Sequence, residues 1–151
     1  MFRDFFALLE QTGCRPFSEA ARIAAGMIDR GEGRITFTRH KNARTGKSRV
    51  VCLTDKAVEV LRRRGEGKGP DVLVFHTRNG FAFTGPNTVQ RIRRLERVCR
   101  RERFGQYAIR HSYIVEALER GTSSDIIAEL VGTRRRRSPA TTTTPTRSGT
   151  Q

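Results

Sequence analysis

The spacing of the apolar residues constrains the fold of this sequence most, because it changes along the chain from helical to strand-like and back. Near the N-terminus the apolar residues recur every three or four positions, which is typical of an amphipathic helix. They are Phe2, Phe5, Phe6 and Leu9. The same periodicity, bounded by capping residues and glycine breaks, predicts further helices. The predicted helices span residues 2–11, 16–25, 55–64, 84–103, 108–118 and 125–131.

Two short segments, residues 34–38 and 48–53, instead alternate polar and apolar residues, as half-buried strands do. Residues 42–47 between them are rich in glycine, lysine and arginine, which predicts a β-hairpin with a basic tip. Residues 72–75 form a short apolar run that fits either a third strand or an extended segment. The sequence therefore predicts an α+β domain that is mainly helical and contains a small antiparallel sheet.

The composition changes abruptly after Thr133. Four arginines at 134–137 are followed by a Ser-Pro-Ala segment and a run of threonines without apolar periodicity. We expect residues 134–151 to be a disordered basic, threonine-rich tail, because such a segment cannot bury enough apolar surface to fold. Residues 1–133 then form one folded domain of modest size.

The charge predicts a polyanionic partner. Lys and Arg number 30 against 15 Asp and Glu, which leaves a net charge of +15, and the pI is about 11.4. The simplest polyanion is nucleic acid. Arginine outnumbers lysine strongly, which suits bidentate phosphate recognition, although a GC-rich genome produces the same bias.

Several classes of protein are excluded by what the sequence lacks. No apolar run is long enough to span a membrane, and the N-terminus lacks the layout of a signal peptide. The cysteines, Cys14, Cys52 and Cys99, are odd in number and widely spaced, which fits neither a disulfide framework nor a zinc site. We therefore expect a cytoplasmic protein without a disulfide framework or a zinc site.

Four motifs follow one another along the predicted domain. The first is Thr-Gly-Cys-Arg-Pro-Phe-Ser-Glu-Ala at 12–20, and the second is Lys41 at the hairpin. The third is Tyr-Ala-Ile-Arg-His-Ser at 107–112, and the fourth is Ile-Ala-Glu-Leu-Val-Gly at 127–132. In this order and at these separations, they resemble the catalytic domain of the tyrosine recombinases, the phage-integrase family. The resemblance covers residues 1–133.

The resemblance implies how these residues act. In the family reaction a tyrosine hydroxyl attacks a DNA phosphodiester and forms a 3′-phosphotyrosine link, so DNA is broken and rejoined without a cofactor. Arg15 and Arg110 would clamp the phosphate oxygens through charge-assisted hydrogen bonds. Lys41, with Lys47 as its rival, would protonate the leaving 5′ oxygen. Tyr107 stands in the position of the HxxRH-box histidine, and His111 follows Arg110.

The implied partner is double-stranded DNA, together with further protomers of the family's tetramer, although a fragment is a weaker candidate for that assembly. The candidate DNA-binding residues are Arg39, Arg44, Lys47, Arg91 and Arg94. The arginines of residues 91–101 fit either a solvated helix face or a face that tracks the phosphate backbone. Glu19 is expected to pair with a neighbouring arginine rather than to take part in chemistry.

The sequence departs from the family pattern at several places. Arg15 and Glu19 are four residues apart instead of three, with Phe17 as the apparent insertion, and Tyr107 replaces a histidine. Thr133 takes the place of the histidine in the family's hydrophobic-Gly-His motif, and no tyrosine follows Tyr113, so the nucleophile is absent. We also expect the family's N-terminal DNA-binding domain to be missing from this chain. We therefore expect an incomplete catalytic domain that binds DNA weakly and does not exchange strands.

We hypothesise that the tail is a frameshift product. Threonine codons have the form ACN, and a shift of one base turns a run of them into NAC codons for Tyr, His, Asn or Asp. Residues 141–144 would then read as the His/Tyr-rich stretch where the family carries its nucleophile. The coding DNA tests this hypothesis, which fails if neither alternative frame places a tyrosine between 141 and 145.

Two other functions remain open from the sequence. A non-catalytic basic DNA-binding module would bind in a salt-sensitive manner without a covalent product. An RNA-binding basic protein would need aromatic residues exposed on a sheet for base stacking, whereas the phenylalanines here stand at core-like spacings.

Overall fold

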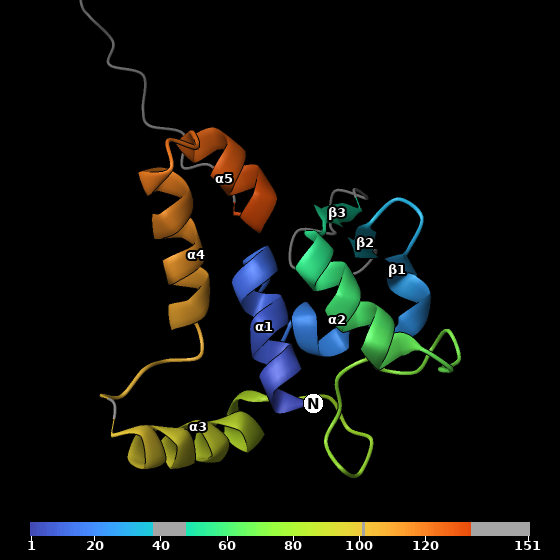
Figure 1. Cartoon of the computed structure of the whole chain (residues 1–151), viewed down its shortest axis with the longest axis vertical. Helices are drawn as coiled ribbons and strands as arrows, with labels where there is room; N and C mark the ends of the chain where they lie inside the picture. The colour runs from blue at the N-terminus through green and yellow to red at the C-terminus, as the bar shows by residue number, and fades with distance from the viewer. Residues whose placement is uncertain (38–47, 101, 134–151) are drawn as a thin grey trace, which may run out of the picture.

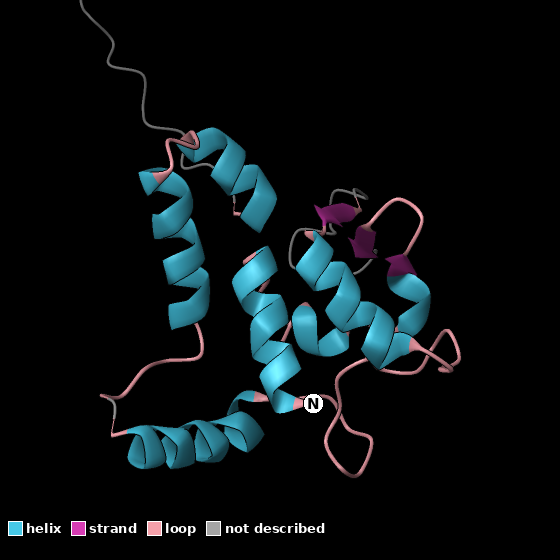
Figure 2. Cartoon of the chain, viewed as in Figure 1, coloured by secondary structure: helices cyan, strands magenta, loops and turns pink. Residues whose placement is uncertain are grey.

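A computed structural model describes residues 1–37, 48–100 and 102–133. The first helix, α1 (Phe2–Thr12), lies in the middle of the molecule, with α4 (Ala108–Glu119) on one side and α2 (Asp55–Gly65) on the other (Figure 1). The small sheet lies beyond α2, and α3 (Gly85–Cys99) and α5 (Ser124–Val131) lie near opposite ends of α1. The mainly helical fold with a small antiparallel sheet is confirmed (Figure 2).

The core is built on the apolar face of α1, as its periodicity predicts. Phe5, Leu8 and Leu9 are fully buried, and the ring of Phe5 meets those of Phe75 and Phe83 edge to face at 5.5 and 5.0 Å. Such edge contacts add to the free energy of burying the rings. The helix ends at Gly13, which adopts the left-handed conformation with φ 57° and ψ 17°.

The predicted α-helix at residues 16–25 is wrong. This segment forms a turn followed by two short 3₁₀ helices, Ala20–Arg22 and Ala25–Met27. The amides of Ala20 and Ala21 donate to carbonyls five residues back, those of Arg15 and Pro16. This wider turn accommodates one residue more than an α-helical turn, so the four-residue separation of Arg15 and Glu19 fits without an α-helix.

The predicted hairpin is confirmed as strands β2 (Arg34–Phe37) and β3 (Arg49–Cys52), which pair antiparallel with Ile35 opposite Val51. The loop between them lies outside the described residues. The strand that completes the sheet is β1 (Ile28–Asp29), which pairs with β2 and was not predicted. Residues 72–75 stay outside this sheet and contribute an isolated bridge between Ala24 and Leu73, which supports the extended alternative.

The remaining helices begin and end close to the predicted residues, except for α3. That helix ends at Cys99 rather than at 103, because Arg100 turns into the left-handed region with φ 51°. Its buried stripe consists of Thr88, Ile92 and Glu96, whereas the apolar Leu95 and Val98 are exposed.

Candidate functional site

Three arginines from different parts of the chain meet at the C-terminal end of α5. Arg15 follows the Gly13 turn, Arg49 begins β3, and Arg110 lies in the first turn of α4. Each donates a hydrogen bond to one of three consecutive backbone carbonyls, at distances of 2.6–2.7 Å. Arg49 reaches Leu130, Arg110 reaches Val131, and Arg15 reaches Gly132. We call these three residues the arginine cluster.

The arginine cluster suits the end of a helix. The last carbonyls of a helix lack partners within the helix, and the helix dipole places partial negative charge there. Three guanidiniums satisfy these carbonyls and so hold α5 to α1, to α4 and to the sheet. Gly132 ends α5 in the left-handed conformation, as the glycine at that position predicts.

Glu19 is the acidic centre of the arginine cluster. Its side chain is 1% exposed, its Oε1 accepts from Nη1 of Arg15 at 2.6 Å, and its Oε2 forms an ion pair with Arg49. Burial opposes ionisation of Glu19, but hydrogen bonds and charge from Arg49, with the amide and guanidinium of Arg15, hold its pKa below its ordinary value. Glu19 therefore pairs with arginines, as expected, and leaves an excess of positive charge.

Arg110 is the more buried of the two predicted phosphate ligands. It is 8% exposed, and its guanidinium donates to the Gly13 carbonyl at 2.5 Å and to Oγ1 of Thr133 at 3.2 Å. Burial, and then the charge of Arg15, lower its pKa, although a guanidinium remains charged at any ordinary pH. Arg15 and Arg110 thus lie together at the end of α5, and Thr133 lies beside them.

The other predicted site residues are placed differently. Tyr107 is 45% exposed at the start of α4, and His111 is exposed one turn further along the helix. Neither side chain forms a hydrogen bond with another residue in the described part of the chain. Lys41, Arg39, Arg44 and Lys47 lie outside the described residues.

The arginine-rich face of α3 is exposed to solvent. Its members are Arg91, Arg93, Arg94 and Arg97. Arg91 lies over the rings of Phe2 and Phe83, at 5.7 and 5.9 Å from their centroids, which anchors one cation at the surface of the core.

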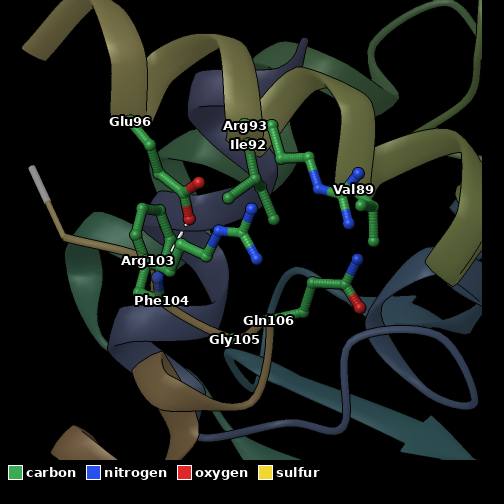
Figure 3. Close-up of a pocket in the computed structure, with 8 residues that line it drawn as sticks. All are labelled: Val89, Ile92, Arg93, Glu96, Arg103, Phe104, Gly105 and Gln106. Atoms are coloured by element: carbon green, nitrogen blue, oxygen red, sulfur yellow. Dashed lines mark hydrogen bonds between the residues drawn. The ribbon is translucent and has the colours of Figure 1, made fainter.

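A cleft of about 280 Å³ lies between α3 and the loop that follows it, and Arg93, Arg103 and Gln106 extend into it (Figure 3). Buried Glu96 fixes this loop by accepting the amide of Phe104 at 2.9 Å. The side-chain amide of Gln106 is held by a second hydrogen bond, which it donates to Oγ1 of Thr88 at 2.9 Å. The cleft thus presents two guanidiniums and an amide.

Arg49 is the member of the cluster that sequence reasoning missed. The signal was present in the strand alternation, because residues 49 and 51 share the face of β3 that turns inward. An arginine on that face needs an acidic partner, and the buried Glu19 is that partner.

The described residues contain no group of acidic, histidine or cysteine side chains that could hold a metal ion. Within the same residues, no helix is long and apolar enough to cross a membrane.

Comparison with known proteins identifies the fold. No protein-family model matches the sequence. A tyrosine recombinase of Thermosipho africanus is 28% identical over 98 residues, which cover 64% of this chain and 34% of that protein. The chain therefore spans about a third of the length of this curated relative.

Solved structures agree with this relative. The Tn1549 transposon integrase in complex with a circular intermediate DNA superposes with a TM-score of 0.70 at 16% identity, over 87% of this chain and 50% of that one. XerH site-specific recombinase bound to its difH substrate gives 0.67 at 22% identity, over 88% of this chain and 39% of that one. XerA recombinase gives 0.67 at 16% identity, over 88% and 54%. The chain has the fold of tyrosine recombinase catalytic domains, as its motifs predict.

Proposed function

We propose that this chain is a tyrosine recombinase catalytic domain that holds a phosphate of double-stranded DNA between Arg15 and Arg110. The observation that carries the proposal is the convergence of these two guanidiniums on the adjacent carbonyls of Gly132 and Val131. Residues 95 positions apart thereby present their charge at one point, where Glu19 supplies the single carboxylate among the described residues. A phosphodiester oxygen pair is the ligand that such a fork of donors fits best.

The guanidiniums keep donors available for a phosphate. Each guanidinium carries five N–H groups. Among the described residues, the side chain of Arg15 uses two of them, on Glu19 and Gly132, and Arg110 uses three, on Gly13, Val131 and Thr133. The remaining N–H groups are fixed in direction by these contacts, which is the kind of preorganisation that stabilises charge developing on phosphate oxygens.

The proposed parent reaction is DNA integration or site-specific recombination through a 3′-phosphotyrosine link. In it, Lys41 or Lys47 protonates the leaving 5′ oxygen, and Tyr107 and His111 donate hydrogen bonds from the start of α4 to the phosphate. This chain contains tyrosine at positions 107 and 113 alone. Tyr107 precedes the phosphate-binding Arg110, and the ring of Tyr113 packs against Gly13, so we propose that neither acts as the nucleophile.

The rest of the DNA contact is proposed to run along further basic residues. The backbone phosphates on either side of the clamped one would be bound by Arg91 and Arg94 on α3 and by Arg39, Arg44 and Lys47 of the hairpin. Such contacts fix the orientation of a protein on DNA without reading its sequence. Assembly with further recombinase protomers belongs to the same proposal.

Two measurements test the proposed function. Fluorescence anisotropy with a labelled duplex at several salt concentrations should show binding that weakens as salt rises, since each phosphate contact releases counterions. Incubation with a nicked duplex, followed by denaturing electrophoresis, should show no covalent protein–DNA product. A covalent product would contradict the proposal that this chain lacks a nucleophile. Tighter binding to RNA than to DNA in competition would contradict double-stranded DNA as the partner. The burial of Phe5, Phe75 and Phe83 in the core argues against a stacking platform for RNA bases.

A further inference from the structure

Arg49 is a buried cation with two partners among the described residues and no direct role in the proposed phosphate clamp. Its side chain is 7% exposed, its Nη1 forms an ion pair with Glu19, and its Nη2 donates to the Leu130 carbonyl at 2.6 Å. One guanidinium thus joins the acidic centre of the arginine cluster to the last turn of α5.

The surroundings of Arg49 close it off from a ligand. The Cα of Gly132 lies so close that a Cβ at this position would be 2.9 Å from Nε of Arg49. The same Nε is buried and has no hydrogen-bond partner among the described residues. An unsatisfied buried donor costs about 1–3 kcal/mol. The contacts of Arg49 with Glu19 and Leu130 must offset this cost, because an arginine that faced solvent would not incur it.

The two contacts of Arg49 fix the geometry of Arg15. The Oε2 atom of Glu19 is shared between Arg49 and the backbone amide of Arg15, which donates to it at 2.8 Å. The Oε1 atom holds Nη1 of Arg15, and Nη2 of Arg15 reaches Gly132, two residues beyond the carbonyl that Arg49 holds. Loss of Arg49 therefore removes one of the two guanidiniums that hold the carboxylate and one of the three contacts that hold the helix end against which Arg15 is aligned.

We propose that Arg49 is a positioning residue of the DNA site, which fixes Glu19 and the end of α5 so that Arg15 and Arg110 present their donors to the phosphate. This inference rests on the proposed function for its effect on DNA, and on the contacts of Arg49 alone for its effect on Glu19. Lysine is a poor substitute, because a single ammonium cannot match the planar fork that reaches both partners.

Salt dependence separates positioning from direct contact. A residue that binds a phosphate contributes about 0.9 to the slope of log K against log salt concentration, and its removal lowers the slope by that amount. A positioning residue changes affinity and leaves the slope unaltered. A residue that supports the fold alone changes thermal stability and leaves the DNA affinity of the folded protein unaltered.

The experiment compares Arg49→Met and Arg49→Lys with the matched control Arg34→Met. Arg34 is exposed on the neighbouring strand and pairs with Asp29, so its removal changes the net charge equally but does not touch Glu19. Duplex binding is measured by anisotropy across a salt series. The titration of the Glu19 carboxyl is followed by carbon NMR on the same samples, with circular dichroism to verify folding.

We expect Arg49→Met to weaken duplex binding by about 10-fold, by analogy with the loss of an outer-shell partner at a metal site, with the slope unchanged. We also expect it to raise the pKa of Glu19 toward its ordinary value, because one of its two guanidinium partners is gone. Arg49→Lys should restore part of both properties, and Arg34→Met should resemble the wild type. If Arg49→Met does not fold, the comparison of Arg49→Lys with the wild type decides the same questions.

Two results would overturn the positioning role. One is a Glu19 titration that is unchanged in the Arg49 variants, and the other is a slope that falls by about 0.9, which would make Arg49 a direct phosphate ligand. If the wild-type chain binds no duplex, the proposed function fails. The Glu19 titration then still shows whether Arg49 controls the carboxylate.

Discussion

The ring of Tyr113 on α4 lies against Gly13 at the end of α1, so closely that a Cβ atom at position 13 would be 2.5 Å from Cδ1 of the ring. Gly13 also adopts a left-handed conformation, and its carbonyl accepts from Arg110. The residue therefore ends the helix, makes room for α4 and orients a member of the arginine cluster. Only glycine meets the first two of these requirements without strain.

We predict that Gly13→Ala is strongly destabilising. The left-handed backbone costs an alanine about 1–2 kcal/mol, and the displaced ring adds about 1–3 kcal/mol of overpacking. Gly67→Ala is the matched control, because Gly67 has φ 69° and nothing within 4 Å of an added Cβ. Urea unfolding measures the free energy of unfolding of both variants. If the two variants lose the same free energy of unfolding, the ring of Tyr113 does not clash with the added methyl group at position 13.

A second prediction concerns Asp4, which connects α1 to the last turn of α2. Its Oδ1 accepts from Arg63 at 2.8 Å and its Oδ2 accepts from Nε of Arg64 at 2.5 Å. Burial opposes ionisation, but the hydrogen bond and charge of Arg64, with the charge of Arg63, lower the pKa of Asp4 overall. The unfolded chain therefore binds the proton more tightly than the folded one, so this stabilisation is present above the unfolded pKa and is lost as pH falls through the folded pKa.

Asp4→Asn should remove about 2 kcal/mol at neutral pH, which is typical for hydrogen bonds to a charged group. The difference from the wild type should shrink as the pH falls below the unfolded pKa of the carboxyl, because the unfolded chain takes up the proton first, and it should be lost below the folded pKa. Chemical unfolding at a series of pH values measures it. Glu59→Gln is the control, because Glu59 pairs with Arg62 at an exposed position where such a pair contributes little. A loss that does not depend on pH would contradict the role of the Asp4 charge.

The spacing of apolar residues was sufficient to predict those helices and strands whose apolar face packs into the core. The helix of Phe5 and Leu9 and the hairpin of Ile35 and Val51 have this property, and both are present. Residues 16–25 do not, because contacts between distant parts of the chain decide their conformation. The carboxylate of Glu19 must face both Arg15 and Arg49, and a five-residue turn places it there.

The site was predictable as an ordered set of motifs, and less so as a set of contacts. Arg15 and Arg110 each lie in a recognisable sequence motif, so both could be named as phosphate ligands from the sequence. Arg49 carries none, and its place became visible only when β3 was set beside Glu19. The exposure of Leu95 and Val98 was equally hidden, because periodicity marks an apolar stripe without showing what covers it.

A third prediction uses two arginines of the same helix face. Arg91→Gln and Arg94→Gln should weaken duplex binding alike and lower the salt slope by about 0.9 each, if both bind phosphates. Only Arg91→Gln should also reduce the free energy of unfolding, by about 0.5–1 kcal/mol, because Arg91 alone lies over the rings of Phe2 and Phe83. Anisotropy and urea unfolding on the same preparations measure the two effects. An unchanged slope in both variants would make this face a solvated surface.

The last prediction concerns the phosphate clamp itself. In Arg15→Lys the charge is kept, but one ammonium cannot hold Glu19 and the Gly132 carbonyl as the two ends of a guanidinium do. We expect duplex affinity to fall by about 10-fold or more, the loss that roughly 1.4 kcal/mol of binding free energy represents. Arg22→Lys is the control, since Arg22 is exposed in the same segment and makes the same change of residue type. If Arg15→Lys binds duplex as tightly as Arg22→Lys, a positive charge alone suffices at position 15, and the bidentate clamp is not what holds the DNA.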